Sequence, residues 1–229
     1  MNILALDTAT AVLSVALASP EGVRCFSADA GLRHSEILME MVDAIMHSAG
    51  LKREDLGLVA CMKGPGSFTG LRIGFAAAKG LALGRGIPMV SIPTLDCMAA
   101  PFSFRKGLVI PVVDAKKHCY FAALYRGGAR ISDYMDADAR SIAAAAATNG
   151  GDEQALLTGP DSPFLQEELS GLSLSEGFIP APFPKRGWAL ELLELSRSYY
   201  GPNPGDPVAA GPLYIRKSDA ELTHNSKKK

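Results

Sequence analysis

The alternation of apolar and polar positions predicts a β-hairpin at the start of the chain and another near its middle. Residues 3–6 are an apolar run that ends at Asp7, and after a short polar turn residues 12–17 alternate, which is typical of strand, turn and strand. A second apolar run begins near Ile110 and ends at Asp114. Each hairpin therefore places an acidic residue at the end of its first strand.

The two hairpins have the same spacing. The second passes through a turn at Lys116 and Lys117 and continues into an alternating run over residues 119–125. Sliding the first copy onto the second superimposes three pairs of residues: Asp7 and Asp114, Ala16 and Ala123, Leu17 and Leu124. This match indicates an ancient duplication, although two unrelated hairpins can also agree over so short a stretch.

The rest of the chain alternates between strands and helices. Further strands are predicted at residues 58–62, 89–92 and 155–158, helices at residues 35–49, 70–84 and 188–200, an alanine-rich stretch at residues 137–147, and a loop at residues 201–212. Such alternation indicates a mixed α/β fold, and 229 residues suit two small domains. We expect subdomains at residues 1–104 and 105–217, followed by a tail at residues 218–229.

A glycine-rich segment, residues 63–74, joins a predicted strand to a predicted helix, where free amide groups favour an anion. It does not match the Walker A phosphate loop, because Leu71 and Arg72 stand where Lys and Ser or Thr are required. Pro65 also removes one backbone amide. The segment is therefore predicted to be a tight turn, with Thr69 as a candidate N-cap of the helix.

After its first residue, the helix at residues 70–84 contains three further glycines, Gly74, Gly80 and Gly84. Each interior glycine costs roughly 1 kcal/mol relative to alanine. Another interaction must offset this loss of helix stability, and we expect it to be the close packing of another helix against the glycines.

The helix at residues 35–49 is the expected partner. Its apolar residues cover an arc of roughly 180°, wider than the roughly 100° that one core face usually needs. Ile37 lies at one edge and Met46 at the other. Such a helix either lies deep in its domain or shares its face with another chain, and we favour contact with another chain. The pattern does not say which edge faces outward.

Charge and composition exclude several classes of protein. The formal net charge is −1, so the chain lacks the basic excess of a protein that grips nucleic acid alone. No apolar run reaches the roughly 18 residues needed to span a bilayer, and no signal peptide is indicated, so a cytoplasmic location without membrane contact is expected. The four cysteines form no C-x-x-C pair and are expected to be small buried hydrophobes.

Four segments together resemble the TsaB (YeaZ) family: residues 64–74, 4–8, 34–38 and 212–216. The resemblance implies an actin-like fold of the α/β class. This fold is a duplicated, ribonuclease-H-like architecture with two similar subdomains, found in the ATPase and sugar-kinase superfamily. It agrees with the repeat of Asp7 and Asp114.

The resemblance also implies a role and partners. The family acts as a non-catalytic subunit in forming threonylcarbamoyladenosine next to the tRNA anticodon, by binding and activating the catalytic paralogue TsaD. It works with the ATPase TsaE, contacts tRNA only indirectly, and forms homodimers when alone. The implied pairing surface comes from the first two helices, on which we select these candidates: Ile37, Leu38, Met41, Val42, Ile45, Met46, Arg72, Phe75, Ala76, Lys79 and Leu83.

Neither catalytic residues nor metal ligands are predicted. The catalytic paralogue has two histidines where Thr94 and Met98 stand here, and neither residue replaces imidazole at a divalent ion. The four histidines, at positions 34, 47, 118 and 224, suggest no cluster. A peptidase is disfavoured because the chain has no H-E-x-x-H motif and Ser67 lies in no nucleophile elbow.

The main alternative is an active small-molecule kinase or ATPase of the same superfamily. In that interpretation Asp7, Thr8 and Asp114 would handle metal and phosphates. The turns after both acids lack the glycines that allow close approach to phosphate, so we regard these residues as a candidate vestigial nucleotide site. Asp7 is also explained without a ligand, as a strand-end acid that caps its turn. No tightly bound cofactor is expected, and ATP or ADP would bind weakly at an interface shared with a partner.

Overall fold

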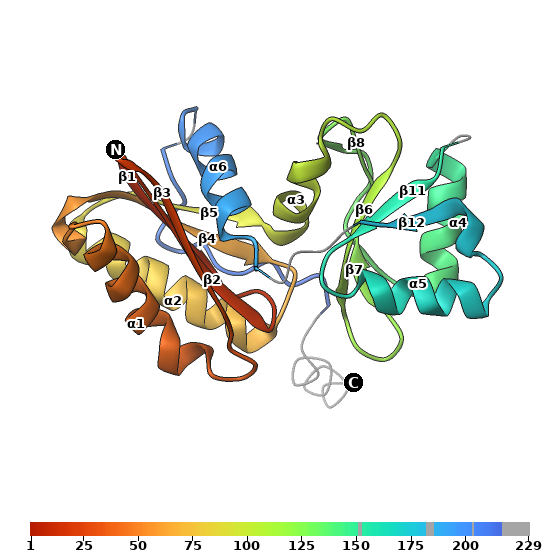
Figure 1. The fold of residues 1–229 in the computed structure, drawn as a ribbon, viewed down its shortest axis with the longest axis horizontal. Helices are drawn as coiled ribbons and strands as arrows, with labels where there is room; N and C mark the ends of the chain where they lie inside the picture. The colour runs from red at the N-terminus through yellow and green to blue at the C-terminus, as the bar shows by residue number, and fades with distance from the viewer. Residues whose placement is uncertain (151–152, 182–185, 203, 217–229) are drawn as a thin grey trace, which may run out of the picture.

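Two β-sheets, each flanked by helices, form two lobes that lie side by side (Figure 1). The computed structural model describes residues 1–150, 153–181, 186–202 and 204–216. The first sheet has the strand order β3-β2-β1-β4-β5, with bounds β1 Asn2–Asp7, β2 Val12–Ser19, β3 Gly22–Asp29, β4 Leu56–Gly64 and β5 Met89–Pro93. The second has the order β10-β7-β6-β11-β12, with bounds β6 Val109–Asp114, β7 Tyr120–Ala122, β10 Met135–Ala137, β11 Ala155–Thr158 and β12 Phe178–Pro180. Two short strands, β8 Tyr125–Arg126 and β9 Ala129–Arg130, extend it.

Three helices follow the strands of each lobe in the same order. They are α1 His34–Ser48, α2 Phe68–Arg85 and α3 Thr94–Ala99 in the first half, and α4 Ala139–Gly150, α5 Ser162–Gly171 and α6 Ala189–Tyr200 in the second. The predicted helices at residues 35–49, 70–84 and 188–200 correspond to α1, α2 and α6, and the alanine-rich stretch forms α4. The predictions missed α3, α5 and β3, together with the short strands β8, β9, β10 and β12.

The sheets confirm the duplication. In each sheet a hairpin pairs antiparallel, and a further strand pairs antiparallel with its second strand. A third strand pairs in parallel with the first strand of the hairpin, and a fourth pairs in parallel with the third. The predicted register is wrong by one residue, however. Ala5 pairs with Ala16, and its counterpart Val112 pairs with Ala122 rather than with Ala123. The cause is a second turn that is one residue shorter, because Asp7 pairs with Ser14 whereas Asp114 pairs with Tyr120.

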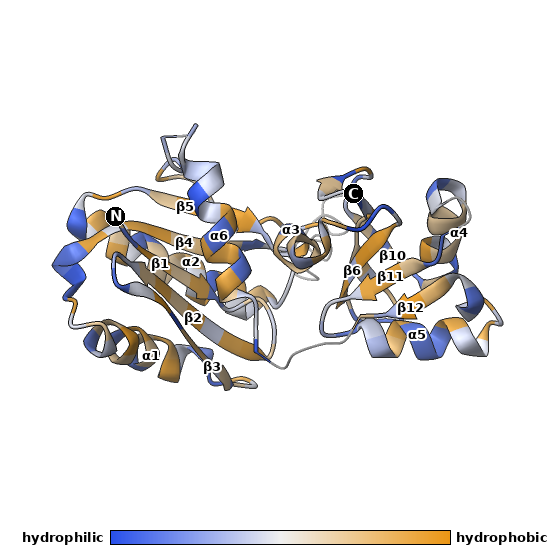
Figure 2. Cartoon of the chain, turned by 45° about the horizontal axis from the view of Figure 1, so that its top comes forward, coloured by the Kyte–Doolittle hydropathy of each residue, from blue (hydrophilic) through white to orange (hydrophobic). Residues whose placement is uncertain are grey.

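The central strands of the first sheet, β1, β2 and β4, are buried on both faces. On one face, Leu4 and Leu6 pack with the inner sides of α1 and α2. On the other, Ile3 and Ala5 belong to a cluster that includes residues of α3, α6 and the second sheet. Strands buried on both faces are apolar along their whole length, and Figure 2 shows β1, β2, β4 and β6 as mostly hydrophobic. One core therefore joins the lobes.

The last helix of each half packs toward the other half. Helix α6 lies on β1, β2 and β5, although it follows the second sheet in sequence, and α3 contacts β6 (Figure 1). The predicted second subdomain, residues 105–217, therefore differs from the structure, in which the part containing α6 belongs to the first lobe. The predicted tail at residues 218–229 lies outside the described residues.

The cysteines are buried to different degrees. Cys61 and Cys97 are buried as expected, whereas Cys25 and Cys119 are half-buried. None of the helices in the described part of the chain has both the length and the apolar character needed to cross a bilayer.

Burial along α1 identifies the edge of the helix that faces inward. Met46 is buried in the core with Leu38, Val42 and Ile45, whereas Ile37 is only half-buried. The wide apolar arc thus serves mainly the protein's own core, and only the Ile37 edge is partly open to solvent.

We predict that Met46→Glu destabilises the isolated chain by several kcal/mol, because it would bury an unpaired carboxylate. Ile37→Glu should cost about 1 kcal/mol or less, since its side chain reaches solvent. Denaturant unfolding of both variants measures the difference. Equal losses of stability would contradict the assignment of the inner edge.

Candidate functional site

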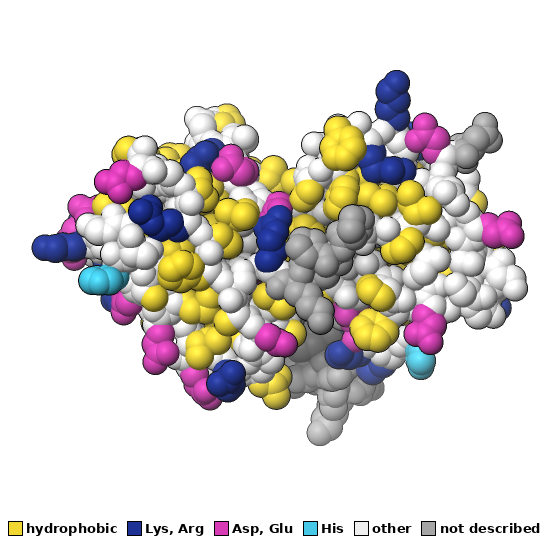
Figure 3. All heavy atoms as spheres, in the orientation of Figure 1, with side chains coloured by type: hydrophobic (Ala, Val, Ile, Leu, Met, Phe, Trp, Pro, Cys, Tyr) yellow, Lys and Arg dark blue, Asp and Glu magenta, His cyan; other side chains and the backbone are white. Residues whose placement is uncertain are grey.

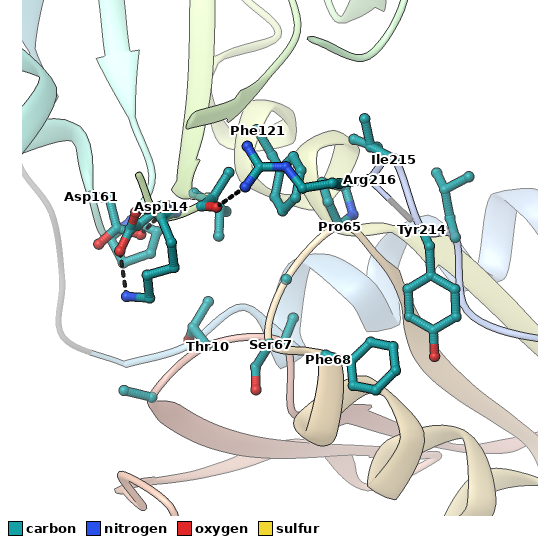
Figure 4. Close-up of a pocket in the computed structure, with 18 of the residues that line it drawn as sticks. Thr10, Pro65, Ser67, Phe68, Asp114, Phe121, Asp161, Tyr214, Ile215 and Arg216 are labelled. Carbon is teal, nitrogen blue, oxygen red and sulfur yellow. Dashed lines mark hydrogen bonds and ion pairs between the residues drawn. The ribbon is translucent and has the colours of Figure 1, made fainter. Parts of the chain in front are cut away.

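A cleft of about 700 Å³ lies between the two lobes (Figure 4). Its walls come from segments far apart in the sequence: the turn after β1, the start of α1, the turn before α2, the turn after β6, Phe121 of β7, residues 160–161 before α5, and the segment at residues 213–216. The two hairpin turns thus face each other across the cleft, as the duplication requires.

Asp7 is completely buried and is occupied by internal hydrogen bonds. Its carboxylate accepts from the backbone N–H of Ala9 at 3.0 Å, the hydroxyl of Ser14 at 3.3 Å and the backbone N–H of Trp188 at 2.7 Å. The interpretation of Asp7 as a strand-end cap is confirmed. Burial raises the pKa of Asp7 to about 6, and these hydrogen bonds only partly offset the effect. Asp7 does not line the cleft.

The Thr8 side chain also makes contacts inside the protein. Its hydroxyl donates to the carbonyl of Gly70 at 2.7 Å. A Cβ on Gly70 would lie 2.1 Å from the Thr8 carbonyl oxygen, and one on Gly74 would lie 2.3 Å from its hydroxyl oxygen. The first turn of α2 therefore requires glycine because the hairpin turn presses against it.

This contact corrects two predictions about α2. The close neighbour of its glycines is the hairpin turn rather than another helix, and Gly80 and Gly84 have open space around them. The N-cap is Ser67 rather than Thr69, with the Ser67 hydroxyl accepting from the Gly70 N–H at 3.2 Å. Ser67 is placed there because its own N–H donates to the Ala9 carbonyl at 2.7 Å.

Asp114 occupies the equivalent position in the second lobe but has a different environment. It lines the cleft and forms an ion pair with Lys116, whose backbone N–H also donates to its carboxylate at 2.7 Å. Partial burial opposes ionisation, yet these hydrogen bonds outweigh it and hold the pKa of Asp114 below its usual range. The backbone N–H of Asp114 donates to Asp161 at 2.8 Å. Of the two predicted acids, only Asp114 is open to the cleft.

The turn after Asp114 is built from three residues in the left-handed region. Lys116, Lys117 and His118 have φ angles of 63°, 58° and 57°. Each such residue costs about 1 kcal/mol or more, because its Cβ crowds the backbone. These Cβ atoms also keep the backbone from approaching a phosphate as closely as a glycine turn would.

The segment at residues 213–216 connects the two lobes across the cleft, and we call it the strap. On the first lobe, the N–H of Leu213 donates to the Lys63 carbonyl at 2.7 Å. On the second, Arg216 forms an ion pair with Asp136 and donates to the Ala115 carbonyl at 2.8 Å. Sequence reasoning found this segment only as a motif, since nothing in its pattern reveals a role at the cleft.

An aromatic and cationic group stands at one end of the cleft, where Figure 4 places Phe68 beside Tyr214 of the strap. The ring centroids are 5.0 Å apart. The Arg72 guanidinium lies 3.8 Å from the Phe68 centroid, and its Nε donates to the Tyr214 hydroxyl at 3.1 Å. Sequence reasoning selected Arg72 but missed both rings.

The positions that would hold the paralogue's metal are internal here. Thr94 and Met98 are both fully buried in α3. His34 binds the Thr10 carbonyl at 2.8 Å and His118 lies 3.4 Å from Glu168, while His47 is exposed. Within the described ranges, no three His, Cys, Asp or Glu residues come together as a metal site. His224 lies outside them.

Comparison with known proteins identifies the family. The family model described as "TsaD: tRNA N6-adenosine threonylcarbamoyltransferase" matches residues 25–167. The chain is 38% identical over 128 residues to the tRNA threonylcarbamoyladenosine biosynthesis protein TsaB of Escherichia coli, covering 55% of each chain. It is 27% identical over 224 residues to the TsaB protein of Bacillus subtilis, covering 96% of each. The chain belongs to the TsaB family.

Solved structures confirm the fold. YeaZ from Pseudomonas aeruginosa superposes with a TM-score of 0.75 at 22% identity, covering 93% of this chain and 99% of that one. EutJ from Carboxydothermus hydrogenoformans, with a TM-score of 0.54 and 12% identity over 84% of this chain and 90% of its own, shares the architecture more distantly. The TsaB family member described here therefore has the actin-like fold that the sequence resemblance implied.

The candidate pairing residues divide into two groups. Five are buried within the monomer: Leu38, Val42, Ile45, Met46 and Phe75. Six are exposed or half-buried: Ile37, Met41, Arg72, Ala76, Lys79 and Leu83. Only the second group can contact another chain without rearrangement, so the set that we selected from the sequence was too wide.

We predict that Asp7 makes the stability of the chain depend on pH. An unfolded aspartate releases its proton near pH 4 and the folded one near pH 6, so the folded state binds the proton more tightly between these values. The free energy of unfolding of the wild type, relative to Asp7→Asn, should therefore fall by about 2 kcal/mol from pH 4 to pH 7. Denaturant unfolding across this range measures it, and a constant difference would contradict the buried, titrating carboxyl.

We also predict opposite effects of two glycine substitutions in α2. Gly70→Ala should destabilise the chain by about 1 to 3 kcal/mol, because the new methyl group would meet the Thr8 carbonyl. Gly80→Ala should stabilise it by about 0.5 to 1 kcal/mol, since its site is open and helical. Thermal melts distinguish them; similar effects would show that the turn does not constrain α2.

Proposed function

We propose that this chain is a non-catalytic subunit that binds TsaD and supports its formation of threonylcarbamoyladenosine in tRNA. The observation that carries the proposal is the buried environment of Asp7, the acid at the end of the first strand. Its carboxylate is buried and bound to Ala9, Ser14 and Trp188, so it is not available to hold a metal and phosphates in the cleft.

The residues at the paralogue's ligand positions support the same proposal. Thr94 and Met98 supply neither imidazole nor carboxylate, both side chains are buried, and Met98 belongs to the core that joins the lobes. A metal at this place would need different ligands and a rebuilt α3. The reacting groups would then come from TsaD, and this chain would act through assembly.

The outer side of α1 and α2 supplies a surface for a partner. Ala76 and Gly80 leave little side-chain bulk on α2, so another helix could approach closely, and Leu83 is 61% exposed beside them in sequence. Ile37 and Met41 add half-buried apolar surface on α1. Hydrophobic side chains are visible among charged ones in the region of α1 and α2 (Figure 3). Arg72 and Lys79 can provide charged contacts at the border.

Shared ancestry supports TsaD as the partner. The TsaD family model matches residues 25–167, which include α1 and α2, so TsaD is expected to carry equivalent helices. Two related chains can then pair through the same surface about an approximate twofold axis. The same reasoning gives a homodimer through this surface when TsaD is absent.

We expect no tightly bound cofactor in this chain. TsaE and tRNA would act in the same complex without binding in this chain's cleft. ATP or ADP would bind weakly, at an interface shared with a partner. The net charge of −1 supports indirect contact with tRNA, since phosphate attraction must come from other subunits.

The alternative, an active small-molecule kinase or ATPase, finds less support. It shares the actin-like fold, but a fold alone does not define an activity. Asp7 does not line the cleft, and Asp114 is held in an ion pair with Lys116 on a turn without glycine.

We predict that Leu83→Glu abolishes co-purification with TsaD while the chain stays folded. The carboxylate would be buried without a partner at the interface, which should weaken binding by about a hundredfold or more. Phe164→Glu is the matched control, because Phe164 is also 61% exposed but lies on the second lobe in α5. Assembly of Leu83→Glu with wild-type affinity would refute the proposed surface.

A second experiment separates scaffolding from catalysis. Reconstituted complexes lacking this chain should lose most of the modified nucleoside, as measured by mass spectrometry of digested tRNA. Complexes carrying Asp114→Asn should retain most of it, because the only predicted acid open to the cleft supplies no reacting group. An assembled but inactive Asp114→Asn complex would instead support a catalytic cleft.

A further inference from the structure

The aromatic and cationic group at the mouth of the cleft has no role in holding the core. Phe68 and Tyr214 are 41% and 40% exposed, although aromatic rings of this size are usually buried. Arg72 lies over the Phe68 ring and donates to the Tyr214 hydroxyl. The three side chains therefore hold one another in place while parts of both rings remain open to solvent.

These rings form one wall of the cleft, and the opposite wall combines charged side chains with Phe121 (Figure 4). The volume of about 700 Å³ falls within the range of roughly 300 to 1,000 Å³ usual for small-molecule sites. At this opposite wall the positive charges of Lys116 and Arg216 are paired with Asp114 and Asp136, and the carboxyl of Asp161 lies beside them. Because these positive charges are already paired with carboxylates, the wall does not favour binding of a polyphosphate.

An aromatic wall next to a charge-balanced wall suits a flat heterocycle that bears hydrogen-bonding groups. A nucleobase can stack on an exposed ring, and a neighbouring arginine adds a cation–π contribution. Asp114 and Asp161 can accept hydrogen bonds from an exocyclic amine or a ribose hydroxyl. A polyphosphate tail, in contrast, would meet these carboxylates.

We propose that Phe68 and Tyr214 form a stacking platform for a nucleobase at the mouth of the cleft. The base would belong either to a free nucleoside or to an unpaired nucleotide in an RNA loop whose backbone phosphates are held by other subunits. This inference rests on the proposed function in one respect only, since a role in tRNA modification would supply such a base. Tyr214 belongs to the strap, so the platform is complete only while the strap spans the cleft.

The test uses the full-length chain and two probes: adenosine in equilibrium dialysis, and a fluorescent RNA hairpin with unpaired adenosines in its loop in anisotropy titrations at low salt. Phe68→Leu and Tyr214→Leu keep an apolar side chain but remove the ring. Each should weaken binding roughly tenfold. Phe104→Leu and Phe164→Leu, at residues 80% and 61% exposed, are the matched controls and should bind like wild type.

Binding of adenosine that depends on both rings would assign the platform to a nucleoside, and ring-dependent binding of the hairpin alone would assign it to RNA. The inference is overturned if the wild type binds neither probe, or if the Phe68 and Tyr214 variants bind as tightly as the controls. It is also overturned if the two variants lose only TsaD, because the rings would then be a protein contact.

Co-purification with TsaD, measured on the same variants, keeps this inference separate from the proposed function. A wild-type chain that assembles with TsaD but binds no base refutes only the platform. A chain that binds the base but never assembles refutes only the scaffold.

Discussion

The buried carboxylate of Asp7 is the constraint on which the arrangement of the two lobes depends. Its three hydrogen bonds connect the end of β1, the start of β2 and the first residues of α6. Because Trp188 follows the second sheet in sequence, this one side chain attaches the last part of the chain to the first hairpin. The Ser14 hydroxyl adds a second bond to the same place by accepting from the Ala189 N–H at 3.1 Å. The shared core forms around this attachment.

Much of the fold could be predicted from local patterns, and the errors have physical causes. Asp7 and Asp114 revealed the duplication because each ends a buried strand. The register was displaced by one residue because turn length does not affect the alternation within a strand. The packing of α6 on the first lobe was missed, since periodicity shows that a helix buries one face but not which sheet covers it.

The site was less predictable than the fold. The glycine-rich segment was correctly interpreted as a turn, but the reason for Gly70 is a contact with Thr8, 62 residues away in sequence. Phe68 and Tyr214 come together from opposite ends of the chain, so no local pattern could select them as a pair. The wide apolar arc of α1 suggested a partner, yet most of it faces the protein's own core.

The strap also determines how freely the lobes can move. The described chain belongs to the first lobe before β6, to the second lobe from β6 to β12 and to the first lobe again at α6, and the strap from Leu213 to Arg216 contacts both lobes. A body joined to another at one point can swing in any direction, and two joints leave a hinge. A third joint resists rotation about that hinge, and α3 and α6 fill the space between the lobes.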